Sequence, residues 1–300
     1  MNVLRTLLAR SIDYAGLFPP ARLSMSEAVS CYASYVKGPD NELLGRFVVA
    51  GQRLGEFARA AESQLPHGEQ STPWRVTALV GSDIDSEREQ ILEFNAGHTA
   101  MSELGHVVCD SVEGRATTAA EIRSIRESFS DLSLMFVEIP AASAETLIPV
   151  IASEGAKAKI RTGGVAPDAF PQPREITTFI AACHRDEVAF KATAGLHHPL
   201  RAEYPLTYEP QSERAPMYGY LNLFLAAATI LSGEEIEVAE EALMESDQRA
   251  IEASHSFLTW RGHRYDEPQI RRLRESLFLS FGSCSFVEPV TEIRAMGLLP

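Results

Sequence analysis

Residues 134–195 read LMFVEIPAASAETLIPVIASEGAKAKIRTGGVAPDAFPQPREITTFIAACHRDEVAFKATAG, a stretch that holds three short apolar runs separated by two longer segments of helical pattern. The apolar runs are Leu134–Ile139, Ala158–Arg161 and Val188–Lys191, and the helical segments are Ser143–Ser153 and Arg174–His184. Short apolar runs that alternate with helices are typical of βα units, whose parallel strands share one sheet. The stretch therefore predicts three consecutive strands of a parallel α/β sheet.

The same alternation continues on both sides of this stretch. Further strands are predicted at Arg46–Ala50, Arg75–Val80 and His106–Cys109, and two weaker ones at Ser11–Tyr14 and Leu279–Phe286. Further helices are predicted at Asp83–Phe94, Thr118–Phe129 and Pro268–Phe278, and from a Ser24 or Ser26 cap to Val36, before Gly38-Pro39. Eight strands in 300 residues predict one (β/α)8 TIM-like barrel domain over residues 1–300, with an open doubly wound sheet as the alternative.

Two extra helical segments, Gly219–Leu231 and Glu235–His255, precede the last predicted strand. We expect these extra helices near the C-terminus either to cap the barrel or to form an oligomer interface. The apolar run within Leu221–Leu231 is compatible with a homodimer, and it is too short to span a bilayer.

Composition and charge narrow the class of protein. A net charge of -14 argues against nucleic acid or an anionic membrane as a partner, although a local basic pocket can still bind a small anionic metabolite. The four cysteines lie far apart without a CxxC pair, which favours reduced thiols. Met1–Leu8 has no cleavage region after it, so we expect a cytoplasmic protein. Nucleotide and dinucleotide glycine-rich motifs are absent from the sequence, and we expect no cofactor.

Charged residues stand at the ends of the three strands in residues 134–191. Residues two apart share a face of a strand, so Lys159 and Arg161 point the same way, while Lys191 and Glu138 end the neighbouring strands. Barrels keep their chemistry at the carboxyl ends of the strands. Glu138 can neutralise one lysine, and the cations that remain predict an anionic substrate group, with Arg161 as its bidentate partner.

The two lysines also suggest a reaction. A lysine beside another cation has its ammonium form disfavoured, and a free amine can attack a carbonyl to form a Schiff base. In this interpretation Lys159 is the nucleophile, Lys191 tunes it, and Glu138 transfers protons.

These residues resemble the class I deoxyribose-phosphate aldolases. Lys159-Ile160-Arg161-Thr162-Gly163 has the K-x-x-T-G form of their Schiff-base strand, and Lys191-Ala192-Thr193-Ala194-Gly195 is similar to the K-A-S-G-G strand that follows. Phe136-Val137-Glu138 is similar to the preceding strand. The resemblance covers residues 134–195 and implies Lys159 as the Schiff-base lysine and Lys191 as its neighbouring cation. Arg161 and His197-His198 depart from that pattern, and Asp110 is only a partial substitute for the expected aspartate.

Further residues are predicted to bind the substrate around these strands. Thr162, Gly163, Gly164 and Thr193 lie in small-residue turns that let backbone N–H groups approach a ligand. Asp13, His197, His198 and Asn222 are further candidate contacts in loops and at a helix start. Cys284, in the last predicted strand, is interpreted as an inert thiol, since no residue that would activate it can be assigned.

Three functions are compatible with these features. The first is a cofactor-independent, aldolase-type lyase that acts on a small phosphorylated or carboxylated carbonyl compound through a lysine Schiff base. The second is a metal-dependent hydrolase or lyase with His197 or His198 and a carboxylate such as Glu138, Asp110 or Asp13 as ligands, although no metal-binding motif is present. The third is a non-catalytic barrel that binds an anionic metabolite.

Overall fold

Eight parallel strands form a closed barrel in the computed structural model, which describes residues 3–81, 83–132 and 134–299. In chain order the strands are β1 (Ile12–Tyr14), β2 (Leu44–Ala50), β3 (Trp74–Leu79), β4 (Val107–Arg115), β5 (Leu134–Glu138), β6 (Lys157–Arg161), β7 (Phe190–Thr193) and β13 (Phe278–Ser283). The barrel closes because β1 pairs with both β2 and β13. The predicted (β/α)8 barrel is confirmed. An open sheet would leave two edge strands each with one unpaired side, and the pairing of β1 with β13 leaves none, so the open sheet is excluded.

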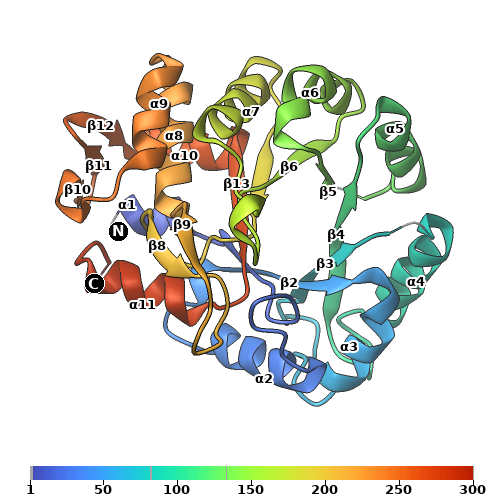
Figure 1. The fold of residues 1–300 in the computed structure, drawn as a ribbon. Coiled ribbons are helices and arrows are strands. Elements are labelled where there is room, and N and C mark those ends of the chain that lie inside the picture. The colour runs from blue at the N-terminus through green and yellow to red at the C-terminus, as the bar shows by residue number, and fades with distance from the viewer. Residues whose placement is uncertain (1–2, 82, 133, 300) are drawn as a thin grey trace.

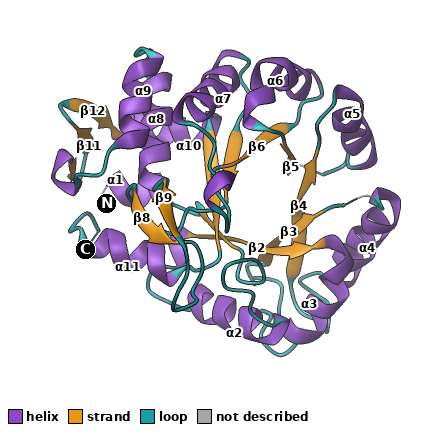
Figure 2. Cartoon of the chain, viewed as in Figure 1, coloured by secondary structure: helices purple, strands orange, loops and turns teal. Residues whose placement is uncertain are grey.

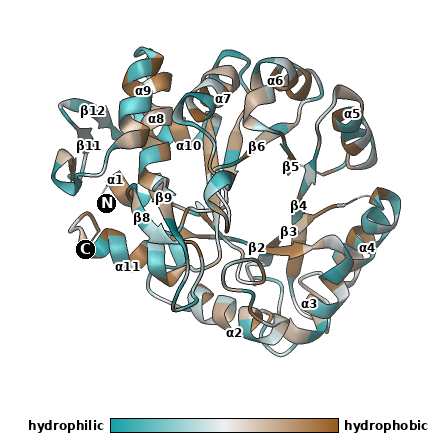
Figure 3. Cartoon of the chain, in the orientation of Figure 1, coloured by the Kyte–Doolittle hydropathy of each residue, from teal (hydrophilic) through white to brown (hydrophobic). Residues whose placement is uncertain are grey.

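Helices surround this ring of strands (Figures 1 and 2). They are α1 (Val3–Leu8), α2 (Met25–Val36), α3 (Leu54–Ala61), α4 (Ile84–Gly97), α5 (Ala119–Ser128), α6 (Ala144–Ser153), α7 (Pro173–Arg185), α8 (Tyr220–Leu231), α9 (Ile236–Met244), α10 (Glu267–Ser276) and α11 (Val287–Ala295). The outer helices carry hydrophilic residues beside hydrophobic ones (Figure 3). In α7, for example, Ile176, Phe179, Ile180 and Cys183 are buried at helical spacing, which places one apolar face on the barrel.

Two helix starts have the side-chain caps that the sequence predicted. The Ser24 hydroxyl accepts a hydrogen bond from the Glu27 N–H, and the Glu27 carboxylate accepts one from the Ser24 N–H. Thr118 and Glu121 form the same reciprocal pair at α5. These caps satisfy N–H groups that a helix start leaves without a partner, and they fix where both helices begin.

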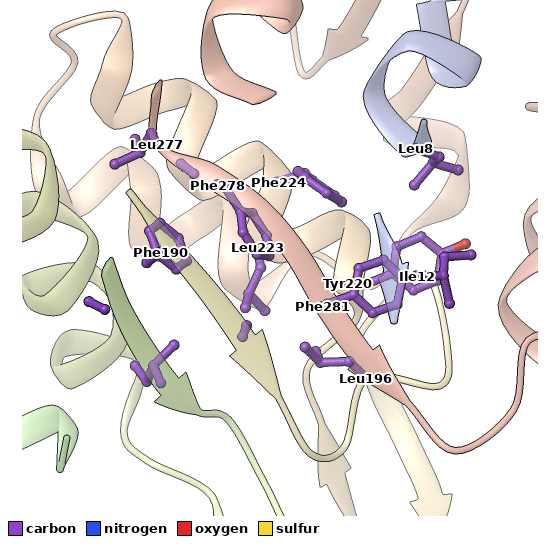
Figure 4. Packing of buried hydrophobic residues seen from close by; sticks show 14 of the residues in the cluster. Leu8, Ile12, Phe190, Leu196, Tyr220, Leu223, Phe224, Leu277, Phe278 and Phe281 are labelled. Atoms are coloured by element: carbon purple, nitrogen blue, oxygen red, sulfur yellow. The ribbon is translucent and has the colours of Figure 1, made fainter. Parts of the chain in front are cut away.

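The apolar helix α8 belongs to the layer outside the barrel. The ring of Phe224 lies 4.3 Å from that of Phe278, and Tyr220 stacks on Phe281 at 4.7 Å (Figure 4). Helices α7, α9 and α10 also contact α8. Burial within one chain therefore explains the apolar run, so this run gives no separate support to the homodimer, which stays a prediction. Within the described residues, none of the helices combines the length and apolarity that a bilayer crossing requires.

The structure differs from the predicted elements in three places. The helix predicted over Glu235–His255 ends at Met244, and the chain continues into an antiparallel sheet. The strands of that sheet are β10 (Ile251–Ala253), β11 (Phe257–Trp260) and β12 (His263–Asp266). Between β7 and α8, where no element was predicted, the chain forms a hairpin of β8 (Ala202–Pro205) and β9 (Arg214–Met217). Strand β4 runs to Arg115 instead of ending at Cys109, because its polar residues Ser111 and Glu113 are buried.

Candidate active site

Five charged side chains form a row of alternating sign inside the carboxyl end of the barrel. Asp13 Oδ2 lies 2.5 Å from Lys191 Nζ, and Lys191 Nζ lies 2.6 Å from Glu113 Oε1. The other oxygen of Glu113 lies 2.7 Å from Lys159 Nζ, which in turn lies 2.8 Å from Glu138 Oε2. All five side chains are buried, and they come from strands β1, β7, β4, β6 and β5. The predicted convergence of Lys159, Lys191 and Glu138 is thus present, with two further carboxylates among them.

Glu113 is the residue that the sequence analysis missed. It lies three residues beyond Asp110, the residue that the sequence suggested as a partial substitute for the expected aspartate. Asp110 instead lies 2.7 Å from Arg46 Nε and 2.5 Å from Arg75, so two arginines on β2 and β3 hold it away from the lysines. Polar residues that alternate with apolar ones along a strand normally face solvent. In a closed barrel the same alternation can instead place the polar residues in the interior.

The carboxylates keep the row charged in spite of its burial. Burial acts to raise the pKa of Glu113, but Lys159 and Lys191 outweigh it and lower that pKa to about 2. Burial acts to lower the pKa of Lys191, but Asp13 and Glu113 outweigh it, so this pKa lies above its ordinary value. Lys191 was expected to act on Lys159 as a neighbouring cation, and in the structure the Glu113 carboxylate lies between the two ammonium groups.

Glu138 connects the row to the rim of the barrel. Besides Lys159, its carboxylate accepts hydrogen bonds from Arg115 Nη2 at 2.8 Å and Nε at 3.1 Å. Burial acts to raise the pKa of Glu138, but Lys159, Arg161 and Arg115 lower it below its ordinary value. Glu138 is thus held as a carboxylate by cations on two sides.

Asp13 holds Lys191 from the first strand. One of its oxygens accepts from the Arg46 N–H at 2.8 Å, and the other accepts from the Ser280 hydroxyl at 2.8 Å. The residue is 1% exposed and does not line the cavity described next. Asp13 therefore binds the Lys191 ammonium group and does not line the space where we expected it to contact the substrate.

A cavity of about 190 Å³ opens above the row. Its charged wall consists of Glu113, Lys159, Arg161 and Lys191. Its apolar wall includes Phe18, Pro19, Val48, Leu79, Leu206 and Met217. Leu206 directly follows β8, and Met217 ends β9. Gly164, Thr193, His197 and Cys284 also line the cavity. The predicted contacts Arg161, Gly164, Thr193 and His197 therefore share one cavity with both lysines.

The glycine turns after β6 and β7 serve packing as well as access to the cavity. A Cβ atom on Gly163 would lie 2.5 Å from the ring of Phe170, and one on Gly195 would lie 3.2 Å from it. A Cβ atom on Gly164 would lie 2.7 Å from Ala169. The segment 169–170 therefore packs against these glycines, while Gly164 and Gly195 also line the cavity.

Three other predicted contacts have partners within the chain and do not line this cavity. The Thr162 hydroxyl donates to Ala194 O at 2.9 Å, which ties together the turns after β6 and β7. The His198 ring stacks on Tyr204, and its Nδ1 lies 2.7 Å from Glu292. Asn222 is fully buried. Its side-chain oxygen accepts a hydrogen bond from Gly219 N, before α8, and its side-chain nitrogen donates one to Ala242 O, in α9. The structure thus gives these residues positions that support the fold of the loops.

His197 and Cys284 lie together in the cavity wall. Cys284 Sγ is 3.6 Å from His197 Nδ1, and the same nitrogen is 3.1 Å from the Ser283 hydroxyl. Burial raises the pKa of the Cys284 thiol to about 11, and burial with the neighbouring His198 lowers the pKa of His197 to about 4. The pair is therefore a neutral thiol and a neutral imidazole, because burial outweighs the Tyr208 hydrogen bond that lowers the pKa of Cys284.

The described residues contain no group of three His, Cys, Asp or Glu side chains arranged to hold a metal ion. The rings of His197 and His198 lie 6.4 Å apart at 78°, as expected for adjacent residues that diverge. His198 faces Glu292, whereas His197 faces the cavity. The two histidines predicted as possible ligands thus do not converge.

No protein-family model matches the chain, and no curated protein matches its sequence.

Proposed function

We propose that the chain is an aldolase-type lyase that forms a Schiff base between Lys159 and a small anionic carbonyl compound. The observation that carries this proposal is the pair of buried lysines on both sides of Glu113, at the end of the barrel where enzymes of this fold keep their active sites. Burying two ammonium groups is unfavourable unless they are paired, so a position that serves packing alone would favour an apolar residue.

Lys159 is the better nucleophile of the two. Lys191 is 2% exposed and its pKa is raised by two carboxylates, which keeps it an ammonium group. Lys159 is 6% exposed, and one of its two partners, Glu138, is shared with the exposed Arg115. A substrate that enters from the cavity can therefore reach Lys159 Nζ while Lys191 stays a cation.

The row supplies the proton transfers that Schiff-base chemistry needs. The Lys159 ammonium first gives a proton to Glu138, and its free amine then attacks the carbonyl carbon while the C=O electron pair moves to oxygen. Lys191 protonates that oxygen, and the added nitrogen gives a proton to Glu113, which returns it to Lys191. Glu138 supplies the second proton, the oxygen leaves as water, and an iminium remains. Glu138 or Glu113 can then remove the proton of a β-hydroxyl group. The adjacent C–C bond breaks, its electrons move to the iminium nitrogen, and an enamine and a free carbonyl fragment result.

The test is intact-mass spectrometry after sodium borohydride reduction with small aldehydes, ketones and keto acids. The sequence holds four lysines, Lys37, Lys157, Lys159 and Lys191, so peptide mapping can assign an adduct without ambiguity. Lys159→Arg and Lys191→Arg keep the positive charge that the carboxylates need but cannot form the imine. Lys37→Ala, on the exposed end of α2, is the control.

The proposal expects an adduct that Lys159→Arg abolishes and Lys37→Ala leaves unchanged. An adduct that maps to Lys191 would overturn the assignment of the nucleophile. Absence of any adduct would overturn the Schiff-base mechanism itself. In that case the non-catalytic anion-binding function would be favoured by the observation that both lysines are already fully ion-paired. Calorimetric binding of the same compounds would test it.

A further inference from the structure

Side chains of this chain fill the place where barrels of this type usually bind a substrate phosphate. Such barrels often bind phosphate with the loops after the seventh and eighth strands and the start of a short helix. In this chain those loops follow β7 and β13, and the helix is α11. The backbone N–H of Ser285 already donates to Ser283 Oγ, and that of Glu288 donates to Ser285 Oγ.

Side chains fill the same place. Tyr208, from the loop between β8 and β9, donates its hydroxyl to Glu288 at 2.8 Å in the first turn of α11. The Tyr208 oxygen is also 3.5 Å from Cys284 Sγ. A phosphate at this helix start would have to displace the Tyr208 ring and would then face the Glu288 carboxylate. The features that bind phosphate elsewhere are therefore engaged within the chain.

The cations that line the cavity belong to β6 and β7. Arg161 lines the cavity and is two residues beyond Lys159 on the same face of β6, or about 7 Å along the strand. Lys159 and Lys191 are each ion-paired with two carboxylates, whereas within the described residues Arg161 lines the cavity without an ion pair. One unpaired cation matches a carboxylate better than the charge of about -1.5 to -2 on a phosphate group.

We propose that the anionic group of the substrate is a carboxylate bonded directly to the reacting carbonyl carbon, so that the site takes a small 2-oxo acid. This inference rests on the proposed Schiff-base function. With the carbonyl carbon at Lys159 Nζ, a carboxylate on that carbon lies on the side of Arg161, whose planar guanidinium suits bidentate binding. At the start of α11 a phosphate would instead meet the Glu288 carboxylate and the Tyr208 ring.

The experiment compares three compounds that react through the same aldehyde group. Glyoxylate carries a carboxylate, acetaldehyde carries no charge, and glycolaldehyde phosphate carries a phosphate. Borohydride adducts at Lys159 are measured against concentration for the unchanged protein and for Arg161→Ala and Arg161→Lys. Arg123→Ala, an exposed position on α5, is the matched control.

We expect glyoxylate to half-saturate adduct formation at a concentration roughly tenfold or more below either other aldehyde. Arg161→Ala should bring the half-saturating concentrations of glyoxylate and acetaldehyde close together, and Arg161→Lys should keep part of the difference between them. Trapping of glycolaldehyde phosphate as readily as glyoxylate, or a glyoxylate preference that survives Arg161→Ala, would overturn this inference and leave the Schiff base standing. No adduct with any of the three would overturn both.

Discussion

Lys159 and Lys191 occupy paired positions on the neighbouring strands β6 and β7, and Glu113 from β4 bonds both ammonium groups with its two oxygens. Two like charges at adjacent buried positions would otherwise repel each other strongly. The bridging carboxylate turns this pair into an alternating row, and Asp13 and Glu138 end it. Glu113 is therefore the residue on which the charge balance of the barrel interior depends.

Glu113→Gln should destabilise the protein by about 3–5 kcal/mol, because it leaves two buried ammonium groups without their shared carboxylate. Urea unfolding followed by circular dichroism measures this change. Glu127→Gln, on the exposed side of α5, should change the free energy of unfolding by less than about 0.5 kcal/mol. A loss below about 1 kcal/mol for Glu113→Gln would show that the row does not hold the barrel interior together.

Acid should weaken the fold through the same residue. The pKa of Glu113 is about 2 in the folded protein against an ordinary value of 4.5, so the unfolded chain takes up the proton first as the pH falls. The stabilisation is complete above pH 4.5 and is lost between pH 4.5 and 2, with a total on the order of 3 kcal/mol. Unfolding free energies measured across this range should fall less steeply in Glu113→Gln. Parallel slopes for the two proteins would contradict the assignment.

His197 should stay uncharged at neutral pH. Burial and the nearby His198 lower its pKa to about 4, so its imidazole does not titrate between pH 5 and 8. Proton NMR of the histidine rings checks this, with the His197 resonance assigned from its loss in His197→Asn. A titration midpoint above pH 6 would show that the cavity wall carries a charge that this structure does not predict.

Cys284 should react slowly with iodoacetamide at pH 8. Its thiol is 4% exposed and has a pKa of about 11, so the thiolate is scarce and poorly accessible. Cys31, which is partly exposed, is the internal reference in the same peptide map. Tyr208→Ala should speed the labelling of Cys284 because it removes the ring whose hydroxyl contacts Sγ. Labelling as fast as that of Cys31 would contradict the neutral thiol.

The sequence was sufficient to predict the barrel and part of its site, because apolar runs and capping residues are local signals. Lys159, Arg161 and Lys191 could be placed together, since alternation within a strand and the common end of parallel strands follow from geometry. Ser24 and Thr118 marked their helix starts for the same reason, because a cap needs only the next few residues.

Other features depended on contacts between distant segments and could not be predicted. Strand β4 carries Ser111 and Glu113, which read as polar surface until the closed barrel buries them. The helical pattern after Glu235 stops where the buried Glu245 accepts hydrogen bonds from Trp260 and Arg261, a tertiary interaction with no local signature. Asn222 looked like a ligand contact, and only the neighbouring loops show that it bonds their backbone.

The Asp13–Ser280 hydrogen bond joins residues 267 positions apart in the chain. Because Asp13 also supports Lys191, the row of charges needs the first and last barrel strands at once. A ribosome that adds about 5–20 residues per second must therefore finish β13 before Lys191 gains the complete surroundings described above. The nascent chain consequently lacks the complete row of charges through most of its synthesis, until the two ends of the barrel meet.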